Sequence, residues 1–103
     1  MYKYNIYIGM FDKDTKQQEI STQDFLNTVR KIMRLKDIKN YTIYKCKGHY
    51  QHEDGTTICE PSINIEIISN TLCIDVLDKI KFILCKELNQ ESVLITKQEL
   101  QVL

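Results

Sequence analysis

Residues 57–69 read TICEPSINIEIIS, and their alternation of apolar and polar side chains decides the fold. Apolar side chains at every second position are typical of a β-strand that buries one face. Upstream, Asp54-Gly55 separates this strand from a second β-rich run over residues 41–51. The Asp-Gly pair favours a two-residue type I′ turn, because both turn positions need a positive φ angle. We therefore expect a β-hairpin over 41–51 and 57–69.

The length of this turn determines which side chains of the hairpin face the core. A two-residue turn places Cys46 across from Ile63 and Tyr44 across from Ile65. Because the isoleucines form the obvious core face, we expect Tyr44 and Cys46 to point inward and the lysines on either side of Cys46 to face solvent. A one-residue change in loop length would reverse this assignment.

Helical periodicity appears once on each side of the hairpin. Ser21 and Asp24 form a variant of the capping box and open a helix over about 22–36. A second helix is expected after Asn70-Thr71, either of which can cap it. The apolar stripes of the two helices are Phe25, Val29, Ile32 and Met33 in the first, and Cys73, Val76, Leu77, Ile80, Ile83, Leu84 and Leu88 in the second.

Strand patterns at residues 2–10 and 92–100 complete a β-α-β-β-α-β order of elements. Right-handed crossovers place both helices on one face of a four-stranded antiparallel sheet, which is the ferredoxin-like α+β arrangement. We expect residues 1–103 to form a single domain of this kind. The sheet face opposite the helices has no element left to cover it, and this open face is the main clue to function.

Composition excludes several classes of protein. The 14 basic and 14 acidic residues balance, whereas nucleic-acid binders normally carry a basic surplus, so nucleic acid is an unexpected partner. No apolar run approaches the roughly 18 residues of a membrane-spanning helix, and we expect a cytoplasmic protein. The cysteines are expected to be reduced core thiols, because their spacing suits no common zinc module: Cys46, Cys59, Cys73 and Cys85.

No catalytic motif, metal site or cofactor site is predicted. The sequence has no G-x-S-x-G, P-loop or G-x-G-x-x-G pattern. His49 and His52 are three positions apart, so on a regular strand they point to opposite faces and cannot share a metal ion. An active site built from this inventory would use tyrosine, histidine, or the carboxylates of Glu60 and Glu66.

The open sheet face is the expected recognition surface. Tyr7, Asn64 and Glu66 should lie on it, and a tyrosine among short polar residues suits binding of a partner. RNA-recognition domains use the same face, but here the basic and aromatic signature is missing. Of the possible uses of this face, we expect self-association: a second copy of the chain covers it, which predicts a homo-oligomer.

Motifs in the second half resemble a family of small bacterial and phage proteins of unknown function. They are Gly48-His49-Tyr50, then Glu60-Pro61-Ser62, and finally Gln90-Glu91-Ser92-Val93-Leu94. The resemblance implies a shared fold and no particular activity. The family often has tryptophan where this chain has Tyr50. Gln90, Glu91 and Ser92 stand at a helix-to-strand junction, and each set of polar residues can also serve simply to satisfy backbone groups.

These observations favour a non-enzymatic binding protein, one that would suit a phage antagonist of host defence acting on a host protein or by sequestering a small ligand. The alternative is a small hydrolase or nucleotide-processing enzyme whose site lies at a subunit interface and uses Tyr50, His52 and Glu60. The candidate binding residues are Tyr7, Tyr50, His52, Glu60, Ser62, Asn64, Glu66, Gln90, Glu91 and Ser92.

Overall fold

The computed structural model describes residues 1–51, 54–91 and 93–103, and it confirms the predicted order of elements. His52, Glu53 and Ser92 lie outside the described residues. The elements are β1 (Tyr2–Gly9), α1 (Thr22–Leu35), β2 (Thr42–Gln51), β3 (Thr57–Ser69), α2 (Ile74–Glu87) and β4 (Leu94–Glu99).

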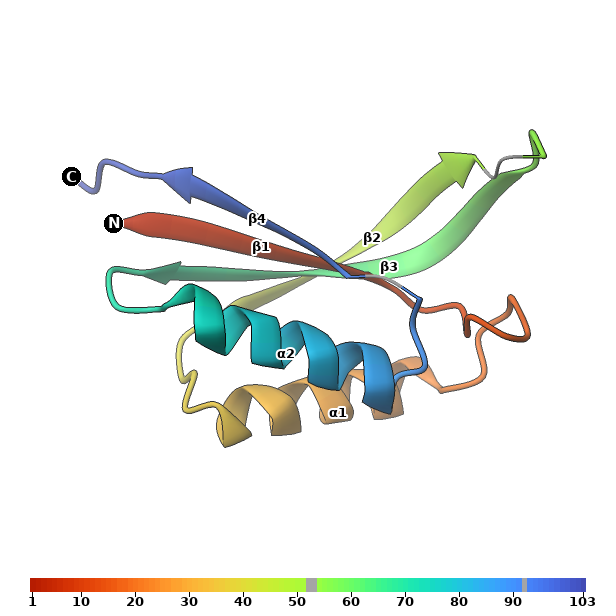
Figure 1. The fold of residues 1–103 in the computed structure, drawn as a ribbon, viewed down its shortest axis with the longest axis horizontal. Coiled ribbons are helices and arrows are strands. Elements are labelled where there is room, and N and C mark those ends of the chain that lie inside the picture. Colours follow the sequence, from red (N-terminus) through yellow and green to blue (C-terminus); the bar gives the residue numbers. More distant parts are fainter. Residues whose placement is uncertain (52–53, 92) are drawn as a thin grey trace.

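The four strands form one antiparallel sheet in the order β2-β3-β1-β4 (Figure 1). Both helices pack on the same face of this sheet, and among residues 1–51, 54–91 and 93–103 no helix covers the other face. This is the predicted ferredoxin-like α+β fold. The sheet is bent, so that its open face is concave between the β2–β3 hairpin and strands β1 and β4. In the described part of the chain, no helix is long and apolar enough to span a membrane.

The core lies between the sheet and the helices. Inward-facing side chains of β1 and β3 alternate with polar ones, as period-two burial requires. The capping residue of α1 is the predicted one, because Ser21 Oγ accepts a hydrogen bond from Asp24 N at 3.1 Å. The largest fully buried side chains are Phe25, Ile6, Ile8, Met33, Ile63, Ile65, Ile80, Leu84, Leu88 and Val29.

The start of α2 differs from the prediction. The helix begins at Ile74 with Cys73 at its N-cap, and Cys73 makes no capping hydrogen bond through its side chain. Asn70 and Thr71 instead belong to the turn before it, where Ser69 Oγ accepts from the backbone N–H groups of Thr71 and Leu72. The hydroxyl of Ser69 therefore stabilises the turn, and the helix begins only after it, at Ile74. Cys73 is exposed and not part of the core.

The register of the hairpin is shifted by one residue from the prediction. Tyr44 pairs with Asn64 and Cys46 with Ser62, so both side chains lie on the open face and not in the core. The last pair joins Gln51 to Thr57, which leaves an odd number of residues between the strands. The prediction of a two-residue turn was wrong, and one extra residue moves every side chain of β2 to the opposite face.

Candidate functional site

A hollow of about 670 Å³ lies on the open face of the sheet. Its walls come from the end of β1, the facing halves of β2 and β3, the loop after β1, and the junction between α2 and β4. Sites for small molecules usually have volumes of about 300–1,000 Å³. The hollow therefore has the size of a ligand site, and it lies on the face that the fold leaves uncovered.

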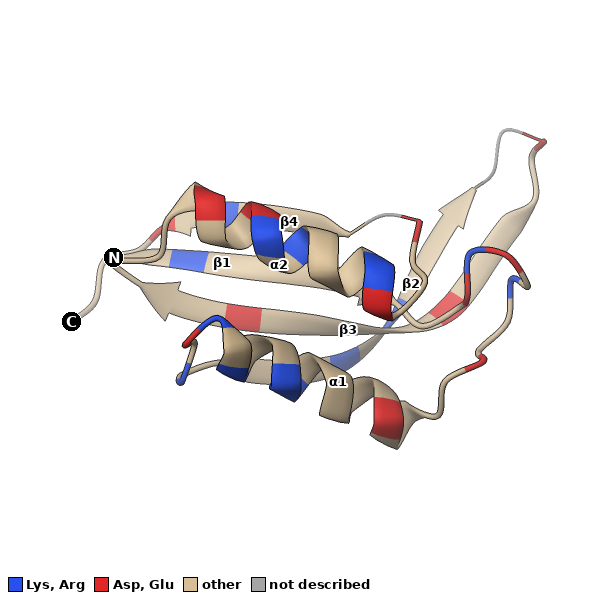
Figure 2. Ribbon diagram, turned by 60° about the horizontal axis from the view of Figure 1, so that its bottom comes forward, with Lys and Arg blue, Asp and Glu red and all other residues tan. Residues whose placement is uncertain are grey.

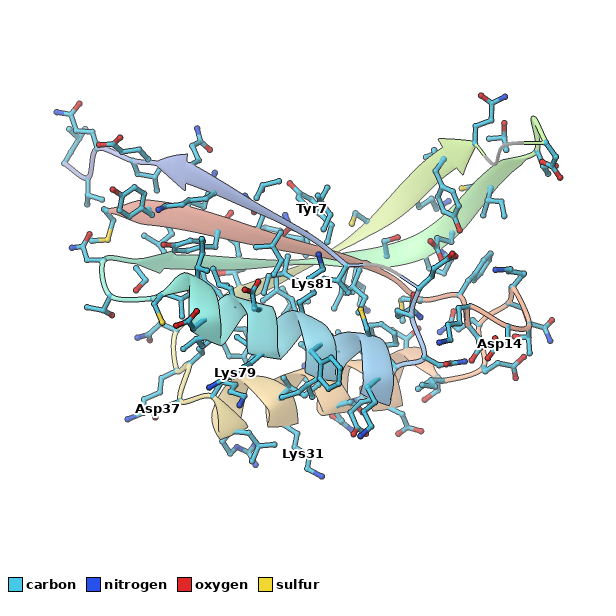
Figure 3. All side chains as sticks on the ribbon, viewed as in Figure 1. Tyr7, Asp14, Lys31, Asp37, Lys79 and Lys81 are labelled. Atoms are coloured by element: carbon cyan, nitrogen blue, oxygen red, sulfur yellow. The ribbon has the colours of Figure 1, made fainter. Side chains whose placement is uncertain are left out.

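The structure brings six of the ten predicted site residues into the lining of this hollow. Asn64 and Glu66 share the open face but lie farther along β3, outside the lining. Figure 3 shows Tyr7 on the side of the sheet away from the helices. His52 and Ser92 fall outside the described residues. The six that line the hollow are Tyr7, Tyr50, Glu60, Ser62, Gln90 and Glu91.

Glu60 is the buried acid of the hollow, with 9% of its surface exposed. Its Oε2 atom accepts a hydrogen bond from the backbone N–H of Phe11 at 2.9 Å. Within the described residues, the ion pair that forms is Lys39–Asp37, and no lysine or arginine pairs with Glu60. Buried carboxylates are normally paired with a cation, because burial disfavours an isolated charge. Among the described residues, hydrogen bonds and not a cation therefore stabilise the Glu60 carboxylate.

Tyr50 lies on the same face beside Glu60. Loss of water around the phenol raises the pKa of Tyr50 above 10.0, and the negative charge of Glu60, a hydrogen bond to Glu60 and the charge of Glu91 add to this rise. Each of these causes disfavours the phenolate. At neutral pH, Tyr50 is a neutral hydroxyl that donates to the Glu60 carboxylate.

Gln90 has a structural role that the sequence left open. It is buried, and its Nε2 atom donates to the carbonyl oxygens of Phe11, at 2.9 Å, and Leu88, at 3.2 Å. The side-chain amide therefore ties the loop after β1 to the end of α2. Glu91, the next residue, is exposed at the rim of the hollow.

The loop after β1 supplies residues that the sequence analysis missed. Asp12 Oδ1 accepts from the N–H groups of Asp14 and Thr15, and Lys16 adopts a positive φ of 60°. Lys13 and Lys16 both line the hollow. Figure 2 shows acidic and basic residues close together along this loop. The tertiary fold brings this loop to the site.

Two glycines also belong to the site, and a sequence signal for them existed. Gly9 and Gly48 lie inside strands and line the hollow. An isolated glycine in a strand often marks a close approach of another group. Glu60 is the group that approaches Gly9, whereas the group closest to Gly48 is the hydroxyl of Ser62. In the β2–β3 register, Glu60 is the residue paired with Gly48.

The fold and the hollow define a ferredoxin-like domain with a ligand-sized site on its open sheet face. No protein-family model and no curated protein sequence matches the chain. Several solved protein chains share the fold, among them those of the following two structures. A phage SAM lyase in complex with S-methyl-5′-thioadenosine matches with a TM-score of 0.71 and 22% identity, over 95% of this chain and 80% of that one. A phage SAM lyase in its apo state matches with a TM-score of 0.66 and 22% identity, over 94% and 78%.

These matches change one expectation from the sequence and support another in part. The expected non-enzymatic binding protein is contradicted, because both similar structures are of an enzyme, and the enzyme alternative fits them better. The expected likeness to phage proteins is supported, since both structures are of phage proteins. At 22% identity the likeness establishes a common fold. The motif-based family of unknown function is not tested by it.

Proposed function

We propose that this protein is an enzyme that binds S-adenosylmethionine (SAM) in the hollow and cleaves it to S-methyl-5′-thioadenosine. The observation that carries the proposal is Glu60, a buried carboxylate with no cationic partner in the described part of the chain. SAM carries a positively charged sulfonium sulfur that would supply this partner. The shared fold with phage SAM lyase supports the same assignment.

The lining of the hollow suits the other parts of this ligand. Tyr7 and Tyr50 offer aromatic rings, which attract both a flat adenine base and a cation over the ring face. Glu91 adds a second carboxylate at the rim. Lys13 and Lys16, in the loop after β1, also line the hollow and offer cations to the ligand's own carboxylate.

The reaction needs only the atoms of SAM. S-methyl-5′-thioadenosine is SAM without its 3-amino-3-carboxypropyl group, so the bond from the γ carbon of that group to sulfur must break. The atoms balance when one carboxylate oxygen of the substrate bonds to the γ carbon while the carbon–sulfur electron pair moves to sulfur. The 3-amino-3-carboxypropyl group leaves as a five-membered lactone that keeps its amino group. The step requires no water and no added proton.

The protein's contribution is to fold the substrate and to keep water away. Holding the carboxylate against the γ carbon removes much of the entropic cost of the step. The step also cancels a negative and a positive charge, so a site with little water favours it over bulk solvent. In the single chain, Tyr50 is still 43% exposed, and its partial burial raises its pKa. Because the hollow is open in one chain, a second copy over the open face would close it.

The proposal is tested by binding and by products. Purified protein is mixed with SAM, and S-methyl-5′-thioadenosine is measured by liquid chromatography against buffer alone. Wild type should form it well above the buffer rate, and E60Q should be strongly impaired. E66Q is the matched control, because Glu66 lies on the same strand and face outside the hollow, and it should remain active. Absence of product and of SAM binding in wild type would overturn the proposal.

The charge of the ligand gives a second readout. S-adenosylhomocysteine has the same shape as SAM without the methyl group and the positive charge. Calorimetry should show tighter binding of SAM than of S-adenosylhomocysteine in wild type, and E60Q should reduce that preference by about tenfold or more, as loss of a charge pair predicts. An unchanged preference in E60Q would show that Glu60 is not the partner of the sulfonium.

A further inference from the structure

We infer that Gly9 is a positioning residue: the space left by its missing side chain holds the Glu60 carboxylate in the hollow. A β-carbon on residue 9 would overlap Oε1 of Glu60 and lie 2.5 Å from Cδ and 2.7 Å from Oε2. Side-chain carbons essentially never approach other groups this closely. The carboxylate therefore occupies the position that the side chain of any other residue would fill. The effect on catalysis rests on the proposed function, whereas the contact itself does not.

The requirement for glycine at this position is spatial and not conformational. Among the glycines, Gly55 has a positive φ angle and Gly9 does not. Gly9 lies in the β1 ladder, paired with Ser62 of β3. The backbone at residue 9 would accept alanine without strain of its own. A substitution there acts through Glu60, the group that it displaces.

Backbone groups also hold the Glu60 carboxylate in place. The side chain of Gln90 contacts one of the residues that supply them. Met10 N donates to the Pro61 carbonyl at 2.9 Å, and Phe11 N donates to Glu60 Oε2 at 2.9 Å. The carbonyl of the same Phe11 accepts from Gln90 Nε2 at 2.9 Å. Gln90 thus holds the residue whose backbone N–H contacts Glu60, through the next peptide group along the chain.

Alanine at position 9 should turn the Glu60 side chain away from Phe11 and Tyr50. The carboxylate then loses a charge-assisted hydrogen bond and occupies part of the hollow. We expect the affinity for S-methyl-5′-thioadenosine to fall by about tenfold or more. The pKa of Tyr50 should fall toward 10.0, because the charge and hydrogen bond of Glu60 both help to raise it.

Gly48 provides a matched control inside the neighbouring strand. A β-carbon there would lie 2.9 Å from Ser62 Oγ but 3.9 Å from Glu60 Cγ, which is ordinary contact. A hydroxyl can rotate away, so G48A should leave the Glu60–Tyr50 contact in place. The double variant G9A/E60D provides a rescue, because the shorter acid clears the added methyl group. Its affinity should be no weaker than that of G9A, although E60D alone weakens binding.

The experiment follows the Tyr50 ring by NMR through a pH titration in protein with ¹³C-labelled tyrosine, with Y50F to assign the signal. Thermal melting and calorimetry with S-methyl-5′-thioadenosine are measured on the same variants. A lower Tyr50 pKa in folded G9A but not in G48A, with weaker binding in G9A and unchanged binding in N5A, would support the inference. Asn5 lies on the open face of β1 outside the hollow, so N5A is the control for binding. A G9A protein that only melts earlier, with unchanged Tyr50 pKa and affinity, would overturn it. If wild type binds no ligand, the proposed function fails, and the Tyr50 titration still decides whether Gly9 positions Glu60.

Discussion

Asn89 Nδ2 donates hydrogen bonds to Asp12 Oδ2 at 2.8 Å and to Asp14 Oδ2 at 2.9 Å, across more than 70 positions of sequence. The backbone strengthens this link, because Lys13 N donates to the Asn89 carbonyl at 3.0 Å. Asn89 itself has a positive φ of 50°. A residue that follows α2 therefore determines the shape of the loop that follows β1, and this loop forms one wall of the hollow.

Removal of the Asn89 amide should loosen this wall. In N89A, we expect faster amide exchange at residues 12–16 and a severalfold loss of affinity for SAM, because Lys13 and Lys16 are no longer held at the hollow. Hydrogen exchange followed by mass spectrometry and calorimetry measure the two effects. N40A, in an exposed loop at the other end of α1, is the control. Unchanged exchange in N89A would show that the loop holds its shape without this side chain.

The free energy of unfolding at acidic pH should depend on Asp12. The hydrogen bond from Asn89 lowers the pKa of Asp12 below 3.8, with help from the N–H groups of Asp14 and Thr15. A lowered pKa in the folded state stabilises the protein above the unfolded pKa, and this contribution disappears as pH falls through the folded pKa. Urea unfolding between pH 5 and pH 2 should therefore show a shallower loss of stability in D12N than in wild type. Equal slopes in the two proteins would contradict the account of Asp12.

Two of the three phenylalanines, Phe25 and Phe82, test the position of the core. Phe25 is fully buried in α1, whereas Phe82 is 68% exposed on α2. F25A should lower the free energy of unfolding by about 3–5 kcal/mol, because it leaves a cavity. F82A should change it by no more than about 0.5 kcal/mol. Chemical denaturation measures both, and a large loss in F82A would indicate that this side chain is covered in the protein in solution.

Self-association through the open face remains a prediction. Tyr44 is 48% exposed on this face, and Oδ1 of its neighbour Asn64 is buried without a hydrogen-bond partner in the described structure. A second copy could cover the Tyr44 ring, and a movement of the Asn64 side chain at the interface could give its oxygen a partner. Light scattering after size exclusion should give a mass above that of one chain, and Y44E should lower it. I74E, on the exposed surface of α2, should leave the mass unchanged. A monomer at high micromolar concentration would contradict the prediction.

The sequence predicts the elements well because local periodicity and core packing agree. Isoleucines at 63, 65 and 67 pair with the buried face of β1, and the stripe of α1 is buried as expected. The hairpin register was missed because it depends on a single residue of loop length, which composition does not reveal. Sequence patterns limit the number of possible folds, but they do not determine which side chains of β2 face the core.

The site was predictable only in part, for a related reason. Glu60, Tyr50 and Ser62 stand out by motif, and the structure brings them together. Gly9, beside Glu60, is an isolated glycine inside a strand pattern, which indicates the close approach of another group. The loop at residues 11–17 has no sequence pattern that indicates a place in the site. That loop reaches the hollow through Asn89 and Gln90, whose partners lie more than 70 positions away. Long-range contacts of this kind are properties of the fold.

The most direct test of the central claim is a single-turnover assay with SAM labelled with ¹³C in its methyl group, followed by NMR. The account predicts that the methyl signal moves from the sulfonium position to that of the neutral thioether in S-methyl-5′-thioadenosine, in wild type and in E66Q but far more slowly in E60Q. A methyl signal that stays at the sulfonium position in wild type, or that disappears at the same rate in E60Q as in wild type, would contradict it.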